Sequence, residues 1–276
     1  MIKVLITGAN GMLGTAISKR LTSVELFTFT SKELDITCAH KVQEKVATLR
    51  PDYIINCAAY TAVDLAEEQR EKAFKINATA VEKLAQIAAQ YDATLIHFST
   101  DYVFDGTSNI PYQPHDITNP INEYGASKLA GEKAIEMLAS KYYIFRISWL
   151  YAPFGKNFFT WLTTTDQQQL NIVTSQVGSP TSALSVANFI HHVIKQDPLQ
   201  YGLYHYVDQG KVSWYEFALK INELAELKKG IHAVDHYPTA AQRPEYSVMD
   251  TSKTEEVFKY LLSPYQIELE KVIERL

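Results

Sequence analysis

The chain is poor in cysteine and has no run of basic residues. Only two cysteines, Cys38 and Cys57, occur among its 276 residues. A chain of this length does not need a disulfide, and Cys57 lies inside the apolar stretch YIINCAA, so we expect it to be free and buried. The formal net charge is −5, and together with the missing basic run this argues against a nucleic-acid partner.

Long hydrophobic runs and metal-binding signatures are also missing. The N-terminal stretch MIKVLITGANG carries one lysine and then a short apolar run. That run is too short for a signal sequence and far too short to cross a bilayer. We therefore expect a cytoplasmic protein without a membrane partner. Neither C-x-x-C nor H-E-x-x-H occurs, and we expect no metal site.

In the first half of the chain, short β-rich runs alternate with helical patterns. The expected strands are 3–7, 24–30, 52–59, 94–100 and 142–151, and the expected helices are 15–23, 40–50, 73–92 and 121–140. This alternation predicts an α/β fold with a Rossmann-type doubly wound parallel sheet. The strands are nearly continuous apolar runs, as expected when helices cover both faces of the sheet.

After Trp149 the alternation becomes irregular. The expected helices are 157–165, 182–196 and 213–227, and the expected short strands are 169–175, 202–208 and 231–237. We predict a dinucleotide-binding domain at 1–150. A smaller α/β region at 151–276 would mainly bind substrate, with some of its segments returning to the first domain.

A glycine-rich turn directly follows the first expected strand. TGANGMLG places Gly8, Gly11 and Gly14 at the start of a helix, with the spacing G-x-x-G-x-x-G. Glycines at such a turn let the backbone bend tightly and approach a pyrophosphate at the helix N-terminus. The position and spacing predict a dinucleotide site and are typical of short-chain dehydrogenases/reductases.

The choice between NADPH and NADH depends on the end of the second expected strand. Thr30, Ser31 and Lys32 stand there, and hydroxyls with an amine suit a 2′-phosphate. Glu33 and Asp35 lie near the position at which an acid would bind the ribose hydroxyls of NADH. The sequence favours NADPH and leaves NADH open.

Four polar residues predict hydride transfer to a ketone. Tyr124 and Lys128 are four apart in NEYGASKLAGE, one turn apart on a helix. An ammonium there would stabilise the phenolate and lower its pKa from about 10, which suits a proton donor. Thr100, at the end of a strand, could bind the reacting oxygen, and Asn77 could hold a relay water. Each of these residues also has an ordinary structural explanation, as a surface pair, a turn cap or an exposed amide.

Longer motifs are spread from end to end, among them GANGMLG, CAAYTAVD, STDYVFDG, NEYGASKLAGE and RPEYSVMDTSK. On these motifs the chain resembles the dTDP-4-dehydrorhamnose reductase family of extended short-chain dehydrogenases/reductases. The resemblance implies reduction of the 4-keto group of dTDP-4-dehydro-L-rhamnose to give dTDP-L-rhamnose, for cell-surface polysaccharide. It implies a small sugar-nucleotide substrate and allows a homodimer.

The resemblance also implies roles for individual residues. The cofactor would contact residues of the turn and of the strand ends, namely Gly8, Gly11, Met12, Leu13, Gly14, Asp35, Ile36, Ala58, Ala59 and Tyr60. Tyr124 would donate the proton and Lys128 would bind the cofactor. The substrate would contact Thr100, Asp101, Tyr102, Trp149 and Arg243. For Arg243, a contact with the substrate diphosphate and a surface salt bridge stay equally open.

The chain departs from the family at several positions. Met12 stands where glutamine is usual, Ala152 where glycine is usual, and Ser185 near the usual place of an aspartate. Some relatives carry a glutamate for a magnesium-bridged dimer where this chain has Thr15, so we do not expect that bridge.

Other functions compete with reduction of this sugar. A dehydratase would need a second acid–base group after Thr100, where this chain has Asp101 and Tyr102. Another sugar-nucleotide 4-ketoreductase or an epimerase would share the cofactor site. A non-catalytic NADP-binding regulatory subunit, like the methionine adenosyltransferase β subunit, is an alternative from a different class.

Overall fold

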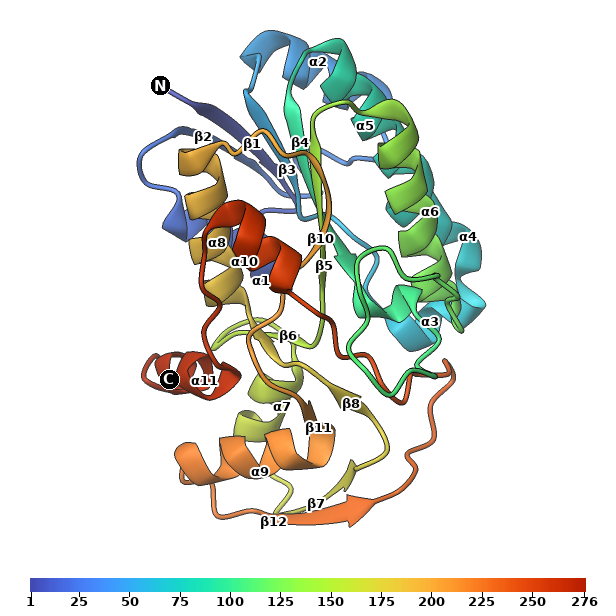
Figure 1. Cartoon of the computed structure of the whole chain (residues 1–276), viewed down its shortest axis with the longest axis vertical. Helices are drawn as coiled ribbons and strands as arrows, with labels where there is room; N and C mark the ends of the chain where they lie inside the picture. Colours follow the sequence, from blue (N-terminus) through green and yellow to red (C-terminus); the bar gives the residue numbers. More distant parts are fainter.

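A six-stranded parallel sheet forms the centre of the computed structural model, which describes residues 1–276 (Figure 1). The strand order is β10-β5-β4-β3-β1-β2, and every pairing is parallel. The strands are β1 (Lys3–Thr7), β2 (Glu25–Phe29), β3 (Tyr53–Asn56), β4 (Thr94–Thr100), β5 (Tyr142–Ile147) and β10 (Gly202–His205). The parallel α/β sheet predicted from the sequence is confirmed. Its order reverses between β1 and β3, where such sheets bind ligands.

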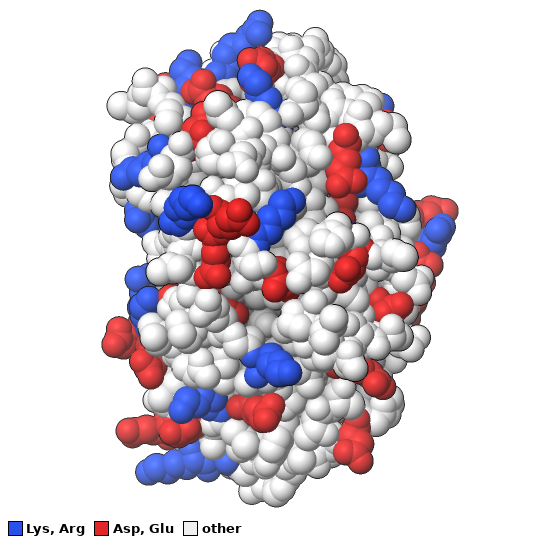
Figure 2. Space-filling model, in the orientation of Figure 1, with Lys and Arg blue, Asp and Glu red and all other residues white.

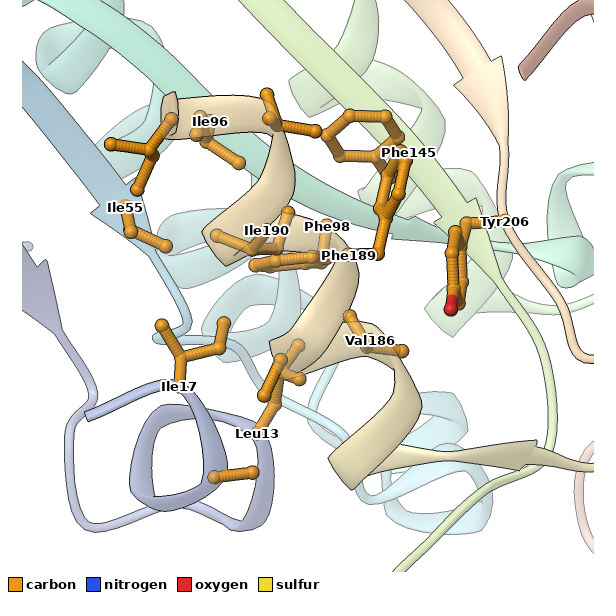
Figure 3. Close-up of a cluster of buried hydrophobic side chains, with 14 of the residues drawn as sticks. Leu13, Ile17, Ile55, Ile96, Phe98, Phe145, Val186, Phe189, Ile190 and Tyr206 are labelled. Atoms are coloured by element: carbon orange, nitrogen blue, oxygen red, sulfur yellow. The ribbon is translucent and has the colours of Figure 1, made fainter. Parts of the chain in front are cut away.

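Helices cover both faces of this sheet because the side chains of its strands alternate. Val4 and Ile6 of β1 pack on one side, and Leu5 packs on the other. The first face is covered by α1 (Met12–Arg20), α8 (Ala183–Gln196) and α10 (Ser252–Phe258), and the second by α2 (Ala39–Leu49), α5 (Ala80–Gln90) and α6 (Glu123–Leu138). Figure 3 shows Ile17 of α1 and Phe189 of α8 in the first of these cores.

Segments from the second half of the chain return to this sheet. Strand β10 extends its edge beside β5, and α8 packs on α1. The division of the chain at residue 150 stays a prediction.

The remaining segments of the second half form a smaller region below the sheet (Figure 1). Strands β7 (Gln169–Val173) and β12 (Gly230–Val234) pair in parallel. They share a core with α7 (Phe158–Thr164), α9 (Trp214–Leu224) and α11 (Tyr265–Ile273). Four two-residue strands complete this region, namely β6 (Leu150–Tyr151), β8 (Val177–Gly178), β9 (Thr181–Ser182) and β11 (Val212–Ser213).

Two expected elements are interrupted. The strand expected at 142–151 ends at Ile147, because Trp149 adopts a left-handed φ of 44° before the chain pairs with β9 as β6. The helix expected at 73–92 comprises the end of α4 (Arg70–Phe74), a π-helical segment (Lys75–Thr79) and α5. The short helix α3 (Val63–Glu68) precedes them.

Charged residues of both signs are interspersed over the face drawn in Figure 2, without a continuous patch of either sign. None of the helices has the length and apolar character that a bilayer-spanning helix requires.

Candidate active site

The glycine-rich turn brings the N-terminus of α1 to the carboxyl end of the sheet. Gly8 has a φ of 65°, and a Cβ there would lie 2.6 Å from the backbone nitrogen of Ala58. A Cβ on Gly14 would overlap the carbonyl oxygen of Gly8, whereas a Cβ on Gly11 would meet only that oxygen, at 3.2 Å. Gly8 and Gly14 are therefore required for the turn itself. Gly11, the N-cap of α1, borders open space.

That open space is a cavity of about 550 Å³ between the carboxyl ends of the strands and the smaller region. Its lining includes many of the residues singled out from the sequence, namely Gly11, Met12, Leu13, Ala58, Ala59, Thr100, Asp101, Tyr124, Lys128 and Trp149. A helix N-terminus at one side and a phenol at the other fit a dinucleotide whose pyrophosphate lies on the turn.

Other candidates do not line this cavity. Asp35 is exposed and accepts a hydrogen bond from the backbone nitrogen of Thr37 at 2.9 Å, while Ile36 is buried. Tyr60 is buried and Tyr102 lies beside the cavity, with its ring edge-to-face on Tyr124 at 6.0 Å. The adenine contacts of Asp35 and Ile36 stay predictions.

Tyr124 lies in the first turn of α6, where it faces the end of β4. Asn122 begins this helix, and its Oδ1 accepts a hydrogen bond from the backbone nitrogen of Gly125 at 2.7 Å. Burial raises the pKa of Tyr124 to about 12, hydrogen bonding by Thr100 lowers it, and the charge of Asp101 raises it. Thr100 and Tyr124 both line the cavity.

Lys128 lies on the cavity but does not lower the pKa of Tyr124. Its Nζ donates to the carbonyl oxygen of Phe98 at 2.6 Å and lies 3.3 Å from Nε2 of His97. Burial lowers the pKa of Lys128 to about 8. The expectation that its ammonium makes the phenol more acidic is therefore wrong for the chain without ligands, because the amine is held on the backbone of β4.

Asp101 is a buried acid. Its Oδ1 accepts a hydrogen bond from the hydroxyl of Thr100 at 3.1 Å. Burial raises the pKa of Asp101 to about 7, although hydrogen bonding by Ser247 and Thr100 acts to lower it. A carboxyl of this kind, on the wall of the cavity, can bind a hydroxyl group as donor or acceptor.

Both faces of the Trp149 ring are covered. The ring of Trp214 stacks on one face, with a centroid distance of 3.7 Å and an interplanar angle of 6°. On the other side, a Cβ on Gly178 would lie 2.5 Å from the indole. The expected contact between Trp149 and the substrate stays a prediction. Trp214, which the sequence analysis did not identify, also lines the cavity.

Arg243 lies outside this cavity, in an ion pair with Asp64. Its Nη2 and Nη1 donate to the two carboxylate oxygens at 2.8 and 3.1 Å. The guanidinium borders a second cavity of about 500 Å³, which shares Phe158 and Trp214 with the first. The salt bridge is thus present, and a contact of Arg243 with the substrate stays a prediction.

Buried polar groups behind the cavity were missed or misjudged from the sequence. The side chain of Asn77 binds the backbone of Tyr60: it accepts from the nitrogen at 2.8 Å and donates to the carbonyl oxygen at 3.0 Å, so it does not hold a water in the expected way.

Both cysteines are free, as expected, but Cys57 is partly exposed because it borders the cavity. Asn56 and His97 were missed, although each is a polar residue in an apolar strand.

Comparison with known proteins gives consistent matches over the whole chain. The family model described as RmlD substrate binding domain matches residues 2–276. The dTDP-4-dehydrorhamnose reductase of Escherichia coli (strain K12) is 37% identical, and the match covers 100% of this chain and 98% of that protein.

Two solved structures are similar in fold and sequence. A dTDP-4-dehydrorhamnose reductase from Clostridium acetobutylicum has a TM-score of 0.95 and 38% identity, with 99% of both chains covered. The enzyme of the same name from Bacillus anthracis, solved in complex with NADP, has a TM-score of 0.95 and 37% identity, with 100% of both chains covered.

Proposed function

The chain belongs to the RmlD substrate binding domain family, that of the dTDP-4-dehydrorhamnose reductases, and we propose that the 550 Å³ cavity is its active site. The protein is an NADPH-dependent oxidoreductase of dTDP-rhamnose synthesis. It reduces the 4-keto group of dTDP-4-dehydro-L-rhamnose to give dTDP-L-rhamnose. The observation that carries the assignment of the site is that Thr100, Tyr124 and Lys128 line one cavity that begins at a glycine-rich turn.

One side of the cavity is suited to the cofactor. Gly11, Met12 and Leu13 would hold the pyrophosphate at the N-terminus of α1, because Gly11 leaves the backbone there open to the cavity. Ala58 and Ala59 would line the cofactor from the end of β3. When bound, NADPH supplies the hydride, and Lys128 would bind the cofactor from the floor of the cavity.

The other side is suited to the reacting sugar. Tyr124 would give its phenolic proton to the oxygen that was the ketone, and the hydroxyl of Thr100 would hold that oxygen. The carboxyl group of Asp101, which lines the cavity, would bind a neighbouring hydroxyl. Trp149 would contact the sugar by its ring edge, because Trp214 and Gly178 cover its faces.

Arg243 would bind the diphosphate of the sugar nucleotide. Its position on the second cavity and the bidentate geometry of its guanidinium support this role. Arg243→Lys should raise the KM for the sugar nucleotide about tenfold or more and leave the KM for NADPH unchanged. The control is Arg70→Lys, which alters an exposed pair with Glu123. If Arg243→Lys and Arg70→Lys had equal KM values for the sugar nucleotide, Arg243 would have no role beyond its salt bridge with Asp64.

A cytoplasmic location and a homodimer also remain proposals. Two free cysteines in one chain support a reducing compartment. The strongly exposed Met137 on α6 is compatible with a partner surface. Analytical ultracentrifugation tests the dimer, and a sedimentation coefficient of a 31.2 kDa monomer would exclude it.

The function is tested by a substrate panel. Purified protein and NADPH are incubated with dTDP-4-dehydro-L-rhamnose and with other 4-keto sugar nucleotides, and the loss of NADPH absorbance is followed. We expect one NADPH consumed per dTDP-4-dehydro-L-rhamnose and much slower turnover of the other sugars. Binding of NADPH without turnover of any sugar would instead support the regulatory-subunit alternative.

A further inference from the structure

A chain of buried polar groups ends on the amine of Lys128. Its members Thr7, Asn56 and His97 are at most 1% exposed and stand on the neighbouring strands β1, β3 and β4. Nδ2 of Asn56 lies 3.0 Å from Nδ1 of His97, and Nε2 of His97 lies 3.3 Å from Nζ of Lys128. The reaction described above does not use these groups.

The backbone of Ala58 fixes the direction of the hydrogen bonds. Its N–H, which can only donate, points at Oδ1 of Asn56 at 3.3 Å, and the hydroxyl of Thr7 donates to the same oxygen at 2.7 Å. The amide nitrogen of Asn56 must therefore face His97, and it donates to Nδ1. Burial, together with the charge of Lys128, holds the pKa of His97 well below its usual range, so the ring is neutral. A neutral imidazole has one N–H, and here it must be at Nε2.

This tautomer aims a hydrogen-bond donor at Lys128. A neutral amine would be well satisfied, since its lone pair accepts from His97 and one of its hydrogens goes to the carbonyl oxygen of Phe98 at 2.6 Å. An ammonium would have one hydrogen facing the N–H of His97, where both groups are donors. We propose that His97 is a positioning residue that presents its Nε2–H to Lys128 and so favours the neutral amine.

The other ionisable groups around Lys128 do not reverse this preference. Glu132, on the same helix, is paired with Arg146 through two hydrogen bonds at 2.7 and 2.9 Å. Cys57 and Tyr124 are neutral at pH 7, because burial raises the pKa of both. Burial lowers the pKa of Lys128 to about 8, against opposing contributions from Glu132 and Cys57.

A lysine whose pKa is lowered in this way sets the upper pH limit of the reaction. If the charged form binds the cofactor, as proposed above, activity is lost as the pH rises through the pKa of Lys128. This consequence rests on the proposed function, whereas the tautomer and the pKa do not, because both are measured without substrate.

The tautomer is tested on the unmutated protein by long-range ¹H–¹⁵N NMR of the histidine rings. We expect a neutral ring at pH 7 that carries its proton on Nε2, and we expect its ¹⁵N chemical shifts to change in Lys128→Met. A proton on Nδ1 would overturn the proposal. This experiment does not depend on any variant at position 97.

The effect on Lys128 is tested with His97→Gln, whose amide oxygen can turn towards Nζ. In ¹³Cε-lysine NMR titrations we expect the pKa of Lys128 to rise by at least one unit, which is a tenfold increase in proton affinity. The pH at which kcat/KM falls on the alkaline side should rise by the same amount, while the KM for the sugar nucleotide stays unchanged. The control is His115→Gln, at an exposed loop position.

The two possible failures can be told apart. An unchanged lysine pKa in His97→Gln would overturn the inference even in an active enzyme. The proposed function would be overturned instead if the unmutated protein turned over no sugar although its His97 tautomer, and the pKa shift of Lys128 in His97→Gln, were as expected.

Discussion

Lys128 donates a hydrogen bond to the carbonyl oxygen of Phe98 at 2.6 Å. This bond fixes the amine of α6 to the backbone of β4, two residues before Thr100. The groups proposed to hold the cofactor and the reacting oxygen are therefore positioned by one strand, β4. A rigid strand holds such groups more exactly than a loop would.

Lys128→Met should weaken both cofactor binding and turnover. The substitution removes the amine but keeps the length of the side chain. We expect the Kd for NADPH to rise and kcat to drop about 100-fold. Fluorescence titration with NADPH measures the Kd, and Lys133→Met, at an exposed position on the same helix, is the control. An unchanged Kd would contradict the cofactor contact.

Two glycine substitutions should separate the turn from the ligand. In Gly14→Ala the new Cβ overlaps the carbonyl oxygen of Gly8, so we expect a loss of about 2 kcal/mol or more in the free energy of unfolding. In Gly11→Ala, at a φ of −70°, the loss should be about 1 kcal/mol or less. The Kd for NADPH should nevertheless rise at least tenfold, because Gly11 faces the cavity. Urea unfolding and NADPH titration of both variants test this. A normal affinity of Gly11→Ala for NADPH would show that the pyrophosphate does not bind at Gly11.

Asp208 should make the protein less stable as the pH rises. It accepts hydrogen bonds from the backbone nitrogen of Ser182 at 2.7 Å and from the hydroxyl of Ser185, and burial raises its pKa to about 8. The folded chain then holds a proton that the unfolded chain, with a pKa of about 3.9, has released. The contribution to stability is therefore full below pH 4 and is lost as the pH rises to 8.

Asp208→Asn should remove this dependence. Between pH 5 and 8 the variant should gain on the order of 3 kcal/mol relative to the unmutated protein. Urea unfolding at the two pH values measures the gain, with the exposed Asp166→Asn as control. Parallel pH profiles for Asp208→Asn and the unmutated protein would show that Asp208 does not hold a proton in the folded state.

The local patterns of the sequence were sufficient to predict the central sheet and many of the residues that meet on the cavity. Apolar strand runs and the glycine spacing depend on near neighbours, and so does the helical spacing of Tyr124 and Lys128. The direction in which the Lys128 amine points does not depend on near neighbours in the sequence. It is set by the carbonyl oxygen of Phe98, thirty residues earlier in the chain.

The covered faces of Trp149 illustrate the same limit. They depend on Trp214 and Gly178, which reach the indole only through the tertiary fold. Contacts of this kind leave no periodic or spaced signal in a single sequence.

The central claim is that Tyr124 gives its proton to the new hydroxyl of the sugar, and Tyr124→Phe tests it most directly. The measurement is the rate of NADPH oxidation in a single turnover with dTDP-4-dehydro-L-rhamnose, with Tyr91→Phe as the control. We predict a rate at least about 100-fold lower with an unchanged Kd for NADPH, since only the acid is lost. A Tyr124→Phe protein that oxidises NADPH within about twofold of the unmutated rate would contradict the account.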